Sequence, residues 1–331
     1  MKSSVERRIR LGLAGTAVAL ALTSAGPAWA QGQIQVDPNL KSYQPVVGIA
    51  GNLNSVGSDT LNNLMTFWVE GFRKLYPNVN IGIEGKGSST APPALIAGTA
   101  QLGPMSRAMK KSEVTELEGT YGFKPTELWV ALDSLAVFVN KDNPVQSLSL
   151  AQVDAIFSKG CKRGLRPITT WGDAGVQDAA WATRPISLYG RNSASGTYGF
   201  FKEHVLSKGD FKDTVKEQPG SSSVVMGITE DKNGIGYSGI GYKTSGVRAI
   251  AIAGDDNTPY EPNCENVING KYPIWRPLYI YTMKKPGKPM DPLTREFFKY
   301  VLSKEGQEVV IKDGFYPLSA TQAEEMLGKL E

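Results

Sequence analysis

Residues 79–90 read VNIGIEGKGSST, and this stretch decides the fold class. Its first part, 79–83, alternates apolar residues with polar or small ones, which indicates a half-buried β-strand. Its end, Gly87-Ser88-Ser89-Thr90, is followed by Pro92 and Pro93, which suit the first turn of a helix, where a missing backbone N–H costs nothing. The stretch therefore predicts a strand that passes into a helix through a cluster of glycine, serine and threonine.

The same order occurs earlier in the chain. Gly57-Ser58-Asp59-Thr60 precedes a segment whose apolar residues recur at helical spacing until Pro77 stops the pattern. These apolar residues are Leu61, Leu64, Met65, Trp68, Phe72 and Leu75. A short strand is expected before the cluster, at residues 46–51. Because strands alternate with helices, the sequence predicts an α/β fold with largely parallel strands.

A third cluster, Ser195-Gly196-Thr197, stands between a predicted strand at 185–189 and a predicted helix that carries His204. Arg191 lies four residues upstream of Ser195. Each cluster offers hydroxyls and free backbone N–H groups at a helix N-terminus, which is the local chemistry for binding an oxyanion. Serine and threonine are also ordinary helix caps, so one cluster would say little. Three clusters together with an arginine predict a site for a small tetrahedral anion.

The predicted site is rich in hydrogen-bond donors. Burying a doubly charged anion is costly unless its oxygens are hydrogen-bonded, and Arg191 would supply a bidentate donor and the main compensating charge. Asp59 is a candidate acceptor for the proton that phosphate keeps near neutral pH and sulfate lacks. The alternative role of Asp59 is to cap the helix that follows it. Ser106 and Arg107 would close the site from a fourth side, or form an ordinary loop with a solvated arginine.

The first 30 residues have the form of a secretory signal peptide, with a basic start, an apolar run at 11–22 and a cleavage signal at Ala28-Trp29-Ala30. Residues 31–45 are expected to be a loose lead-in. Residues 1–30 hold four basic residues and one acidic residue, so the remaining chain carries 32 basic and 31 acidic residues. This near-balance is no evidence for nucleic-acid binding. We expect an exported, periplasmic protein.

The two cysteines, Cys161 and Cys264, are predicted to form a disulfide, because an exported protein meets an oxidising compartment. Two free thiols are the alternative. Their spacing fits no zinc motif, and we expect neither a metal nor another cofactor. A secreted phosphatase would need a base beside its nucleophilic serine. The one histidine, His204, stands among apolar residues of its predicted helix and is expected to pack there.

Taken in order, these motifs resemble the phosphate-binding proteins of phosphate ABC transporters, the PstS type. The segments that carry the resemblance are Gly57-Ser58-Asp59-Thr60, Gly87-Ser88-Ser89, Gly103-Pro104-Met105-Ser106-Arg107, Arg191-Asn192-Ser193-Ala194-Ser195-Gly196-Thr197, Arg276-Pro277-Leu278-Tyr279-Ile280-Tyr281 and Gly306-Gln307-Glu308. The resemblance covers residues 47–319, and its most specific part is the Arg-x-x-x-Ser-Gly-Thr element.

The resemblance implies a two-lobed type II periplasmic-binding-protein fold, each lobe a mostly parallel sheet flanked by helices, with the ligand in the cleft between the lobes. Lobe I would comprise residues 46–136 and 249–331, and lobe II residues 137–248, with crossings near 137–140 and 247–249. The ligand-binding positions that the resemblance carries over are Asp59, Thr60, Ser88, Ser106, Arg191, Ser195, Gly196 and Thr197, to which we add Arg107.

The resemblance also implies a function: a monomeric carrier that captures inorganic phosphate and hands it to a membrane-embedded ABC permease. Many family members have an aspartate where this chain has Ser106, and that aspartate senses the phosphate proton. Because this chain has Ser106 at that position, we expect Asp59 to be the residue that discriminates against sulfate. Sulfate, molybdate, tungstate and arsenate stay open as alternative ligands, and a secreted phosphatase stays open as an alternative activity.

Overall fold

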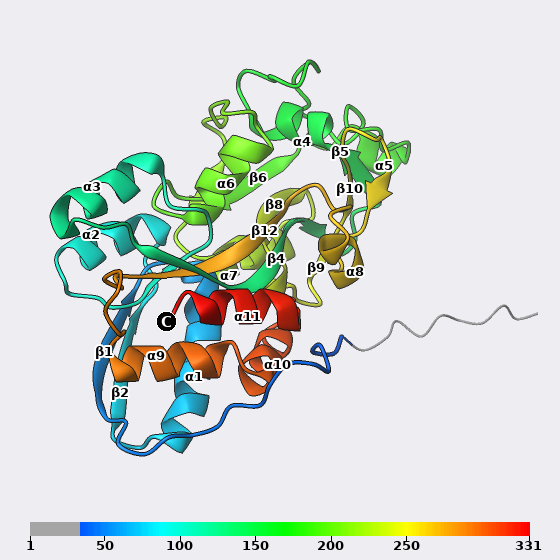
Figure 1. Cartoon of the computed structure of the whole chain (residues 1–331). Coiled ribbons are helices and arrows are strands. Elements are labelled where there is room, and N and C mark those ends of the chain that lie inside the picture. Colours follow the sequence, from blue (N-terminus) through cyan, green and yellow to red (C-terminus); the bar gives the residue numbers. More distant parts are fainter. Residues whose placement is uncertain (1–33) are drawn as a thin grey trace, which may run out of the picture. The chain divides into compact units, whose positions relative to one another are not determined.

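Strands β1 (Gly51–Val56) and β2 (Val79–Glu84) lead into the first two clusters and pair in parallel. They belong to a computed structural model that describes residues 34–331 (Figure 1). Helix α1 (Asn62–Leu75) joins the two strands, and α2 (Ala91–Ile96) follows β2, so the predicted alternation is confirmed. The strand expected at 46–51 is not: β1 begins only at Gly51, because the positive φ of Gly48, 84°, interrupts an extended chain.

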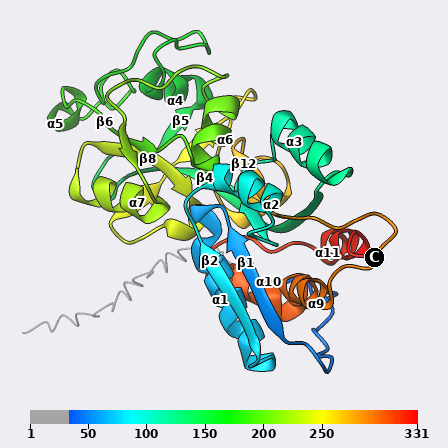
Figure 2. The same cartoon turned by 90° about the vertical axis from the view of Figure 1, so that its left-hand side faces the viewer.

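Helix α1 packs through the apolar face that its sequence predicts. Leu64, Met65, Trp68 and Phe72 have no exposed surface, whereas Leu75 is 41% exposed at the end of the helix. Burial of such a side chain contributes roughly 1.5–3 kcal/mol. In Figure 2, α1 lies with α9 (Pro292–Val301) and α10 (Lys304–Lys312) on one side of the β1–β2 pair. This packing fixes the segments that carry the first two clusters.

A seven-stranded sheet lies at the centre of the described chain, in the order β3-β12-β4-β8-β6-β7 with β9 beside β4. Its strands are β3 (Gly103–Met105), β4 (Thr126–Asn140), β6 (Ser187–Arg191), β7 (Lys216–Gln218), β8 (Gly234–Gly239), β9 (Val247–Ala249) and β12 (Trp275–Thr282). The long β4 pairs with β12 along its first part and with β8 and β9 along its last part. The two predicted crossing segments therefore lie side by side, and the predicted boundary at residue 136 falls inside β4.

The sheets are mixed in direction, which corrects the expectation of mostly parallel strands. Strand β6 is parallel to β7 and β8, and β5 (Ser147–Ser149) is parallel to β10 (Ala251–Ala253). In contrast, β8, β9 and β12 all run antiparallel to β4, β3 runs antiparallel to β12, and β11 (Pro259–Tyr260) runs antiparallel to β10. The reason is that the long strand β4 pairs with three other strands of the sheet. Strands β8, β9 and β12 all run in the direction opposite to β4.

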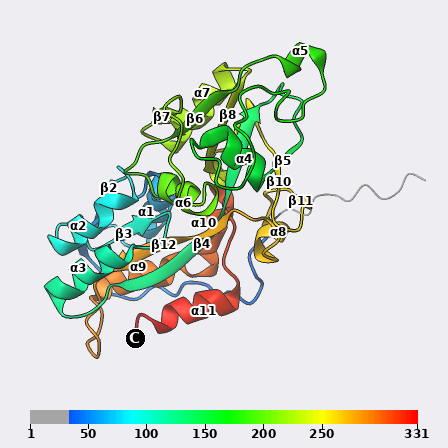
Figure 3. The same ribbon diagram turned by 90° about the horizontal axis from the view of Figure 1, so that it is seen from above.

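Helices cover these sheets, and several begin at the caps that the sequence indicates. Ser149 caps α4 with a capping box, and Asp291 caps α9. The remaining helices are α3 (Lys111–Tyr121), α4 (Leu150–Phe157), α5 (Ala179–Ala182), α6 (Gly196–His204), α7 (Ser221–Glu230), α8 (Cys264–Ile268) and α11 (Ala320–Gly328), with short 3-10 turns η1 (Asp59–Leu61), η2 (Ser88–Thr90) and η3 (Ile240–Tyr242). Figure 3 shows α2 and α3 beside β3, and α11 along β4.

The lead-in is more ordered than expected. The signal peptide predicted at 1–30 lies outside the described residues, but residues 34–45 pack against the C-terminal helices. The hydroxyl of Tyr43 lies 2.6 Å from that of Tyr76 and donates to the buried carboxylate of Glu296 over 2.9 Å. The carboxylate of Asp37 accepts a hydrogen bond from the backbone N–H of Ala320 at the start of α11. A buried glutamate needs such partners, so this segment is held in place.

The predicted disulfide is wrong: Cys161 and Cys264 are both free. The thiol of Cys161 lies 3.9 Å from the carbonyl oxygen of Ser158, and a left-handed φ of 43° sets its direction. Cys264 is the first residue of α8 and packs on the hydrophobic core. Among residues 34–331, no helix is long and apolar enough to cross a membrane.

Candidate functional site

The clusters that are far apart in the sequence meet in the interior. The hydroxyl oxygens of Thr60 and Thr197 lie 2.9 Å apart, although 137 residues separate them. The hydroxyl oxygens of Ser88 and Ser106 lie 3.3 Å apart. All four side chains are almost completely buried. The fold therefore brings one residue from each of the three clusters, and the predicted Ser106, to one place.

Gly196 makes this approach possible. A Cβ atom at this position would lie 2.2 Å from Ser88 Oγ and 2.7 Å from Ser106 Oγ, so no larger residue fits there. Ser195 caps α6: its hydroxyl oxygen accepts hydrogen bonds from the backbone N–H groups of Thr197 and Tyr198. The N-terminus of α6 is thereby directed at the buried hydroxyls, an arrangement that favours negative charge.

Arg191 supplies the positive charge of the site from the end of β6. Its guanidinium is 1% exposed, and its Nη1 lies 3.0 Å from Asp59 Oδ1. Nη1 also donates to Ser221 Oγ over 2.6 Å, and Nη2 donates to the carbonyl of Pro219 over 3.0 Å. Nε is buried and has no partner among the described residues. Burial lowers the pKa of Arg191, and the carboxylate of Asp59 opposes that shift.

Asp59 does not cap its own helix, which was one of its two expected roles. Its Oδ1 accepts hydrogen bonds from the backbone N–H and the hydroxyl of Ser221, over 2.8 and 2.9 Å. The hydroxyl of Tyr242 donates to the carbonyls of Asp59 and Thr60, which fixes the backbone of η1. Burial raises the pKa of Tyr242, so this hydroxyl stays protonated and remains a donor.

Sequence reasoning missed a buried ion pair beneath the site. Arg276 donates through Nε and Nη2 to Asp133 Oδ2, over 2.9 and 2.8 Å, and neither side chain is exposed. Arg276 also donates to the carbonyl of Ser106 over 2.7 Å and to the hydroxyl of Thr197 over 3.0 Å. Burial raises the pKa of Asp133, and Arg276 opposes the rise. The signal was present, because each charge interrupts an otherwise apolar strand segment.

Arg107 lies beside the site but is engaged elsewhere. Its guanidinium forms a bidentate pair with Glu113, over 2.7 and 2.8 Å, and reaches Ser89 Oγ at 3.4 Å. Burial alone would raise the pKa of Glu113, but Arg107 and the backbone N–H of Lys110 hold it below its usual value. Arg107 therefore adds positive charge near the second cluster, with its strongest hydrogen bonds directed at a carboxylate.

The hydrogen-bond pattern leaves the buried hydroxyls as donors. Thr197 Oγ1 accepts from Arg276, and Ser88 Oγ accepts from the backbone N–H of Ser106 over 3.0 Å. In each of the pairs Thr60–Thr197 and Ser88–Ser106 one hydroxyl donates to the other, which leaves one further proton in each pair to donate. The guanidinium of Arg276 and the N-terminus of α6 contact these hydroxyls, and Arg191 is paired with Asp59, the residue before Thr60. Such a set suits an anion with several acceptor oxygens. No cluster of metal-ligating side chains occurs within residues 34–331.

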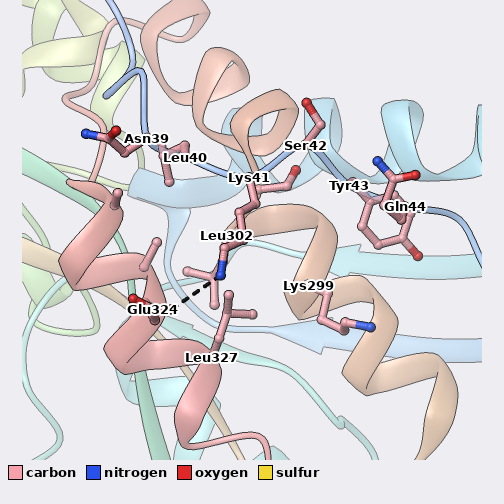
Figure 4. A pocket seen from close by; sticks show the side chains of 13 residues that line it. Asn39, Leu40, Lys41, Ser42, Tyr43, Gln44, Lys299, Leu302, Glu324 and Leu327 are labelled. Atoms are coloured by element: carbon pink, nitrogen blue, oxygen red, sulfur yellow. Dashed lines mark hydrogen bonds and ion pairs between the residues drawn. The ribbon is translucent and has the colours of Figure 1, made fainter.

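A separate pocket of about 330 Å³ lies away from this site, between residues 39–44 and helices α9 and α11. Figure 4 shows its lining, where Lys41 and Glu324 form an exposed ion pair at 3.3 Å above apolar residues such as Leu302 and Leu327. It shares no residue with the buried hydroxyls.

Comparison with known proteins agrees with the fold and shows the family. A family model described as a PBP superfamily domain matches residues 35–305. The phosphate-binding protein PstS of Pseudomonas aeruginosa is 54% identical over 314 residues, which cover 94% of this chain and 97% of that protein. The fold and the buried donor site thus define a solute-binding protein of two lobes. The chain belongs to the PBP superfamily and, within it, to the PstS family of phosphate-binding proteins.

Solved structures give the same assignment of the fold. A protein from Clostridium perfringens with bound phosphate, described as a phosphate ABC transporter substrate-binding protein, matches with a TM-score of 0.67 and 26% identity, covering 81% of this chain and 100% of that one. An ABC-type phosphate transport receptor from Vibrio cholerae has a TM-score of 0.62 and 23% identity, with 80% and 100% coverage, and is similar in fold alone. The two-lobed type II binding-protein fold is thereby established.

Proposed function

We propose that this protein captures inorganic phosphate between its lobes and delivers it to an ABC permease. The observation that carries the proposal is the buried meeting of Thr60, Ser88 and Thr197 next to Arg191. Hydrogen bonds to a charged partner contribute roughly 1.5–3 kcal/mol each. Several of them supply the roughly −8 kcal/mol that micromolar binding needs. The names of the relatives, which are phosphate-binding proteins, support phosphate as the ligand.

The division into lobes follows the central strands. We assign residues 46–136 and 249–331 to lobe I and 137–248 to lobe II, joined by β4 and β9, which pair antiparallel from Phe138 to Asn140. In this division Thr60, Ser88 and Ser106 come from lobe I, and Arg191 and the α6 cluster come from lobe II. An anion bound by both sets draws the lobes together, and the permease recognises the closed form.

The remaining ligand positions follow from the same argument. Asp59, Gly196 and Ser195 line or shape the site, and Arg107 contributes charge at its edge. We assign to Asp59 the role of accepting a hydrogen bond from the protonated oxygen of phosphate. In many family members an aspartate at the position of Ser106 has this role. Oδ1 of Asp59 is engaged by Ser221 and Arg191, so Oδ2 would be the accepting atom.

Three further properties belong to this proposal. The protein acts in the periplasm after export, it works as a monomer, and it changes no covalent bond of its ligand. The last point is supported by the place of His204, which is exposed at the last position of α6 and has its ring centroid 4.2 Å from that of Phe200. Because a helix rises about 1.5 Å per residue, His204 lies too far along α6 from Ser195 to act as the base for that serine.

Calorimetric titration of the phosphate-stripped protein tests the proposal. We expect micromolar or tighter binding of phosphate that excess sulfate does not disturb, and a loss of the phosphate preference in Asp59→Asn. Equal binding of sulfate, or of molybdate, tungstate or arsenate in preference to phosphate, would assign the site to another oxyanion. Turnover of a chromogenic phosphate ester that disappears in Ser88→Ala or Ser195→Ala would instead identify a phosphatase.

A further inference from the structure

One carboxylate oxygen joins three segments of the chain. Oδ1 of Asp59, from η1, accepts from the backbone N–H and the hydroxyl of Ser221 and lies 3.0 Å from Nη1 of Arg191. Nη1 in turn donates to Ser221 Oγ over 2.6 Å. The three side chains therefore form a closed triangle of two hydrogen bonds and one ion pair. Ser221 is the first residue of α7, and Arg191 is the last residue of β6.

Ser221 is fully buried, and the triangle fixes the direction of its hydroxyl. The oxygen accepts from Arg191, so its single proton must go to Asp59. Arg191 is also held through Nη2 by the carbonyl of Pro219. Its Nε is left buried without a partner among the described residues. The guanidinium is thus held on one edge by α7 and its preceding loop, and retains a donor for an anion.

Helix α7 has no cap of its own. Its N-cap residue is Gly220, which has no side chain, and the carboxylate of Asp59, 162 residues away, takes the capping role at Ser221. A Cβ atom at Gly220 would lie 3.3 Å from Asp59 Oδ2, closer than most such contacts, so glycine keeps the approach open. A negative charge at a helix N-terminus is favourable. The contact of Asp59, in η1, with the backbone N–H of Ser221 therefore supplies the N-terminal cap that α7 lacks.

We infer that Ser221 is a positioning residue that orients Arg191 for the anion, and that its contact with Asp59 couples lobe closure to ligand binding. The inference rests on the proposed function and on the lobe division, in which Asp59 lies in lobe I and Ser221 and Arg191 lie in lobe II. When the lobes separate, Ser221 loses its acceptor, α7 loses its cap and Arg191 loses its counter-charge. When they close around the anion, all three are restored together.

Binding measurements on a matched pair of variants test the positioning role. Ser221→Ala removes the buried hydroxyl, whereas Ser222→Ala makes the same change at the next, exposed position of α7. We expect phosphate to bind about tenfold more weakly to Ser221→Ala and unchanged to Ser222→Ala. Because the triangle acts as a unit, Asp59→Asn combined with Ser221→Ala should weaken binding by less than the product of the single effects. Additive effects, or equal affinities of the two alanine variants, would overturn the inference.

Hydrogen exchange at the amides of residues 221–224 tests the coupling. In the wild type and in Ser222→Ala we expect phosphate to slow exchange there, because closure caps α7. In Asp59→Asn and Ser221→Ala the phosphate-dependent slowing should shrink, at phosphate concentrations that saturate each variant. A merely structural role would change exchange equally with and without phosphate, and that result would refute the coupling. A wild type that binds phosphate but shows no slowing would refute it too, whereas a wild type that binds none would overturn the proposed function itself.

Discussion

Arg276 donates a hydrogen bond to the hydroxyl oxygen of Thr197 over 3.0 Å, and the same Nη2 is held by Asp133. The buried ion pair thus engages one lone pair of the Thr197 hydroxyl, which also lies 2.9 Å from the hydroxyl oxygen of Thr60. The side chain of Arg276 is itself almost completely buried. Arg276 is therefore a positioning residue, and the hydroxyl through which it acts can be changed without disturbing the ion pair.

Substitution of Thr197 tests this relationship. Thr197→Ser keeps the hydroxyl, and we expect phosphate affinity within about threefold of the wild type. Thr197→Val keeps the shape but leaves a donor of Arg276 unpaired and removes a donor to the anion, which should cost about 1.5–3 kcal/mol, or about 10–150-fold in the dissociation constant. Calorimetric titration gives both numbers. Equal affinities of the serine and valine variants would show that the hydroxyl does not contact the ligand.

Gly196 gives a second, steric prediction. Gly196→Ala places a methyl group against Ser88 Oγ and Ser106 Oγ, and should abolish closure around the anion and weaken phosphate binding at least 100-fold. Gly119→Ala in α3 is the control, because a Cβ atom there meets nothing within 4 Å. That change should stabilise the protein by roughly 0.5–1 kcal/mol through helix propensity and leave binding unchanged. Unaltered phosphate affinity in Gly196→Ala would mean that α6 does not approach the serines in solution.

Local signals in the sequence were enough to find the three clusters, since a strand, a Gly-Ser-Thr turn and a helix start are all encoded within a dozen residues. Arg191 was found because it stands in the same motif as Ser195. Ser221 was not found, because its contact with Asp59 spans 162 residues and depends on how α7 packs. The packing of Tyr43 on Glu296 spans 253 residues and was missed for the same reason.

The pair of Arg276 and Asp133 shows a different limit of sequence reasoning. Each residue is a charge within an apolar strand, which is a readable sign of a buried polar role. What cannot be read is the partner, because the antiparallel register that sets Arg276 opposite Asp133 is decided by the fold. The prediction of mostly parallel strands was wrong for a related reason. Local alternation of strand and helix does not show that one long strand, β4, will pair with several others in the antiparallel direction.

Arg107 is predicted to matter more for stability than for binding. Arg107→Ala leaves the half-buried carboxylate of Glu113 without its bidentate partner, which should lower the free energy of unfolding by about 1–3 kcal/mol. Phosphate affinity should fall by less than about fivefold, because the guanidinium is engaged by Glu113, whereas Arg191→Ala should lose more than 100-fold. Urea denaturation and calorimetry measure the two effects. Comparable losses of affinity in both variants would make Arg107 a direct ligand.

The free cysteines can be counted directly. A thiol titration of the unfolded, unreduced protein should give two thiols per chain, since Cys161 and Cys264 are its only cysteines and both are free. The same titration after reduction is the control and should give the same number. A count of zero before reduction and two afterwards would show that the bridge forms after all in an oxidising compartment.

Asp313 gives a prediction for the dependence of stability on pH. Burial raises its pKa from 3.8 to about 7, its Oδ2 is buried without a hydrogen-bond partner, and it lies at the C-terminal end of α10, where the helix dipole disfavours negative charge. Because the folded pKa is raised, the folded state binds the proton more tightly than the unfolded state. The resulting stability is present below about pH 4 and is lost as the pH rises through about 7.

Asp313→Asn removes this titration. At pH 8 the variant should be more stable than the wild type by about 2 kcal/mol, roughly half of what the full shift would give because solvent screens a partly exposed carboxyl, and the advantage should shrink towards pH 4, where the wild-type carboxyl is protonated in the folded state. Asp255→Asn makes the same change of charge at an exposed position and is the control. Guanidinium denaturation at several pH values gives the comparison. A constant difference between Asp313→Asn and the wild type from pH 4 to 8 would mean that the carboxyl titrates alike in the folded and unfolded chains, and that its burial is relieved in solution.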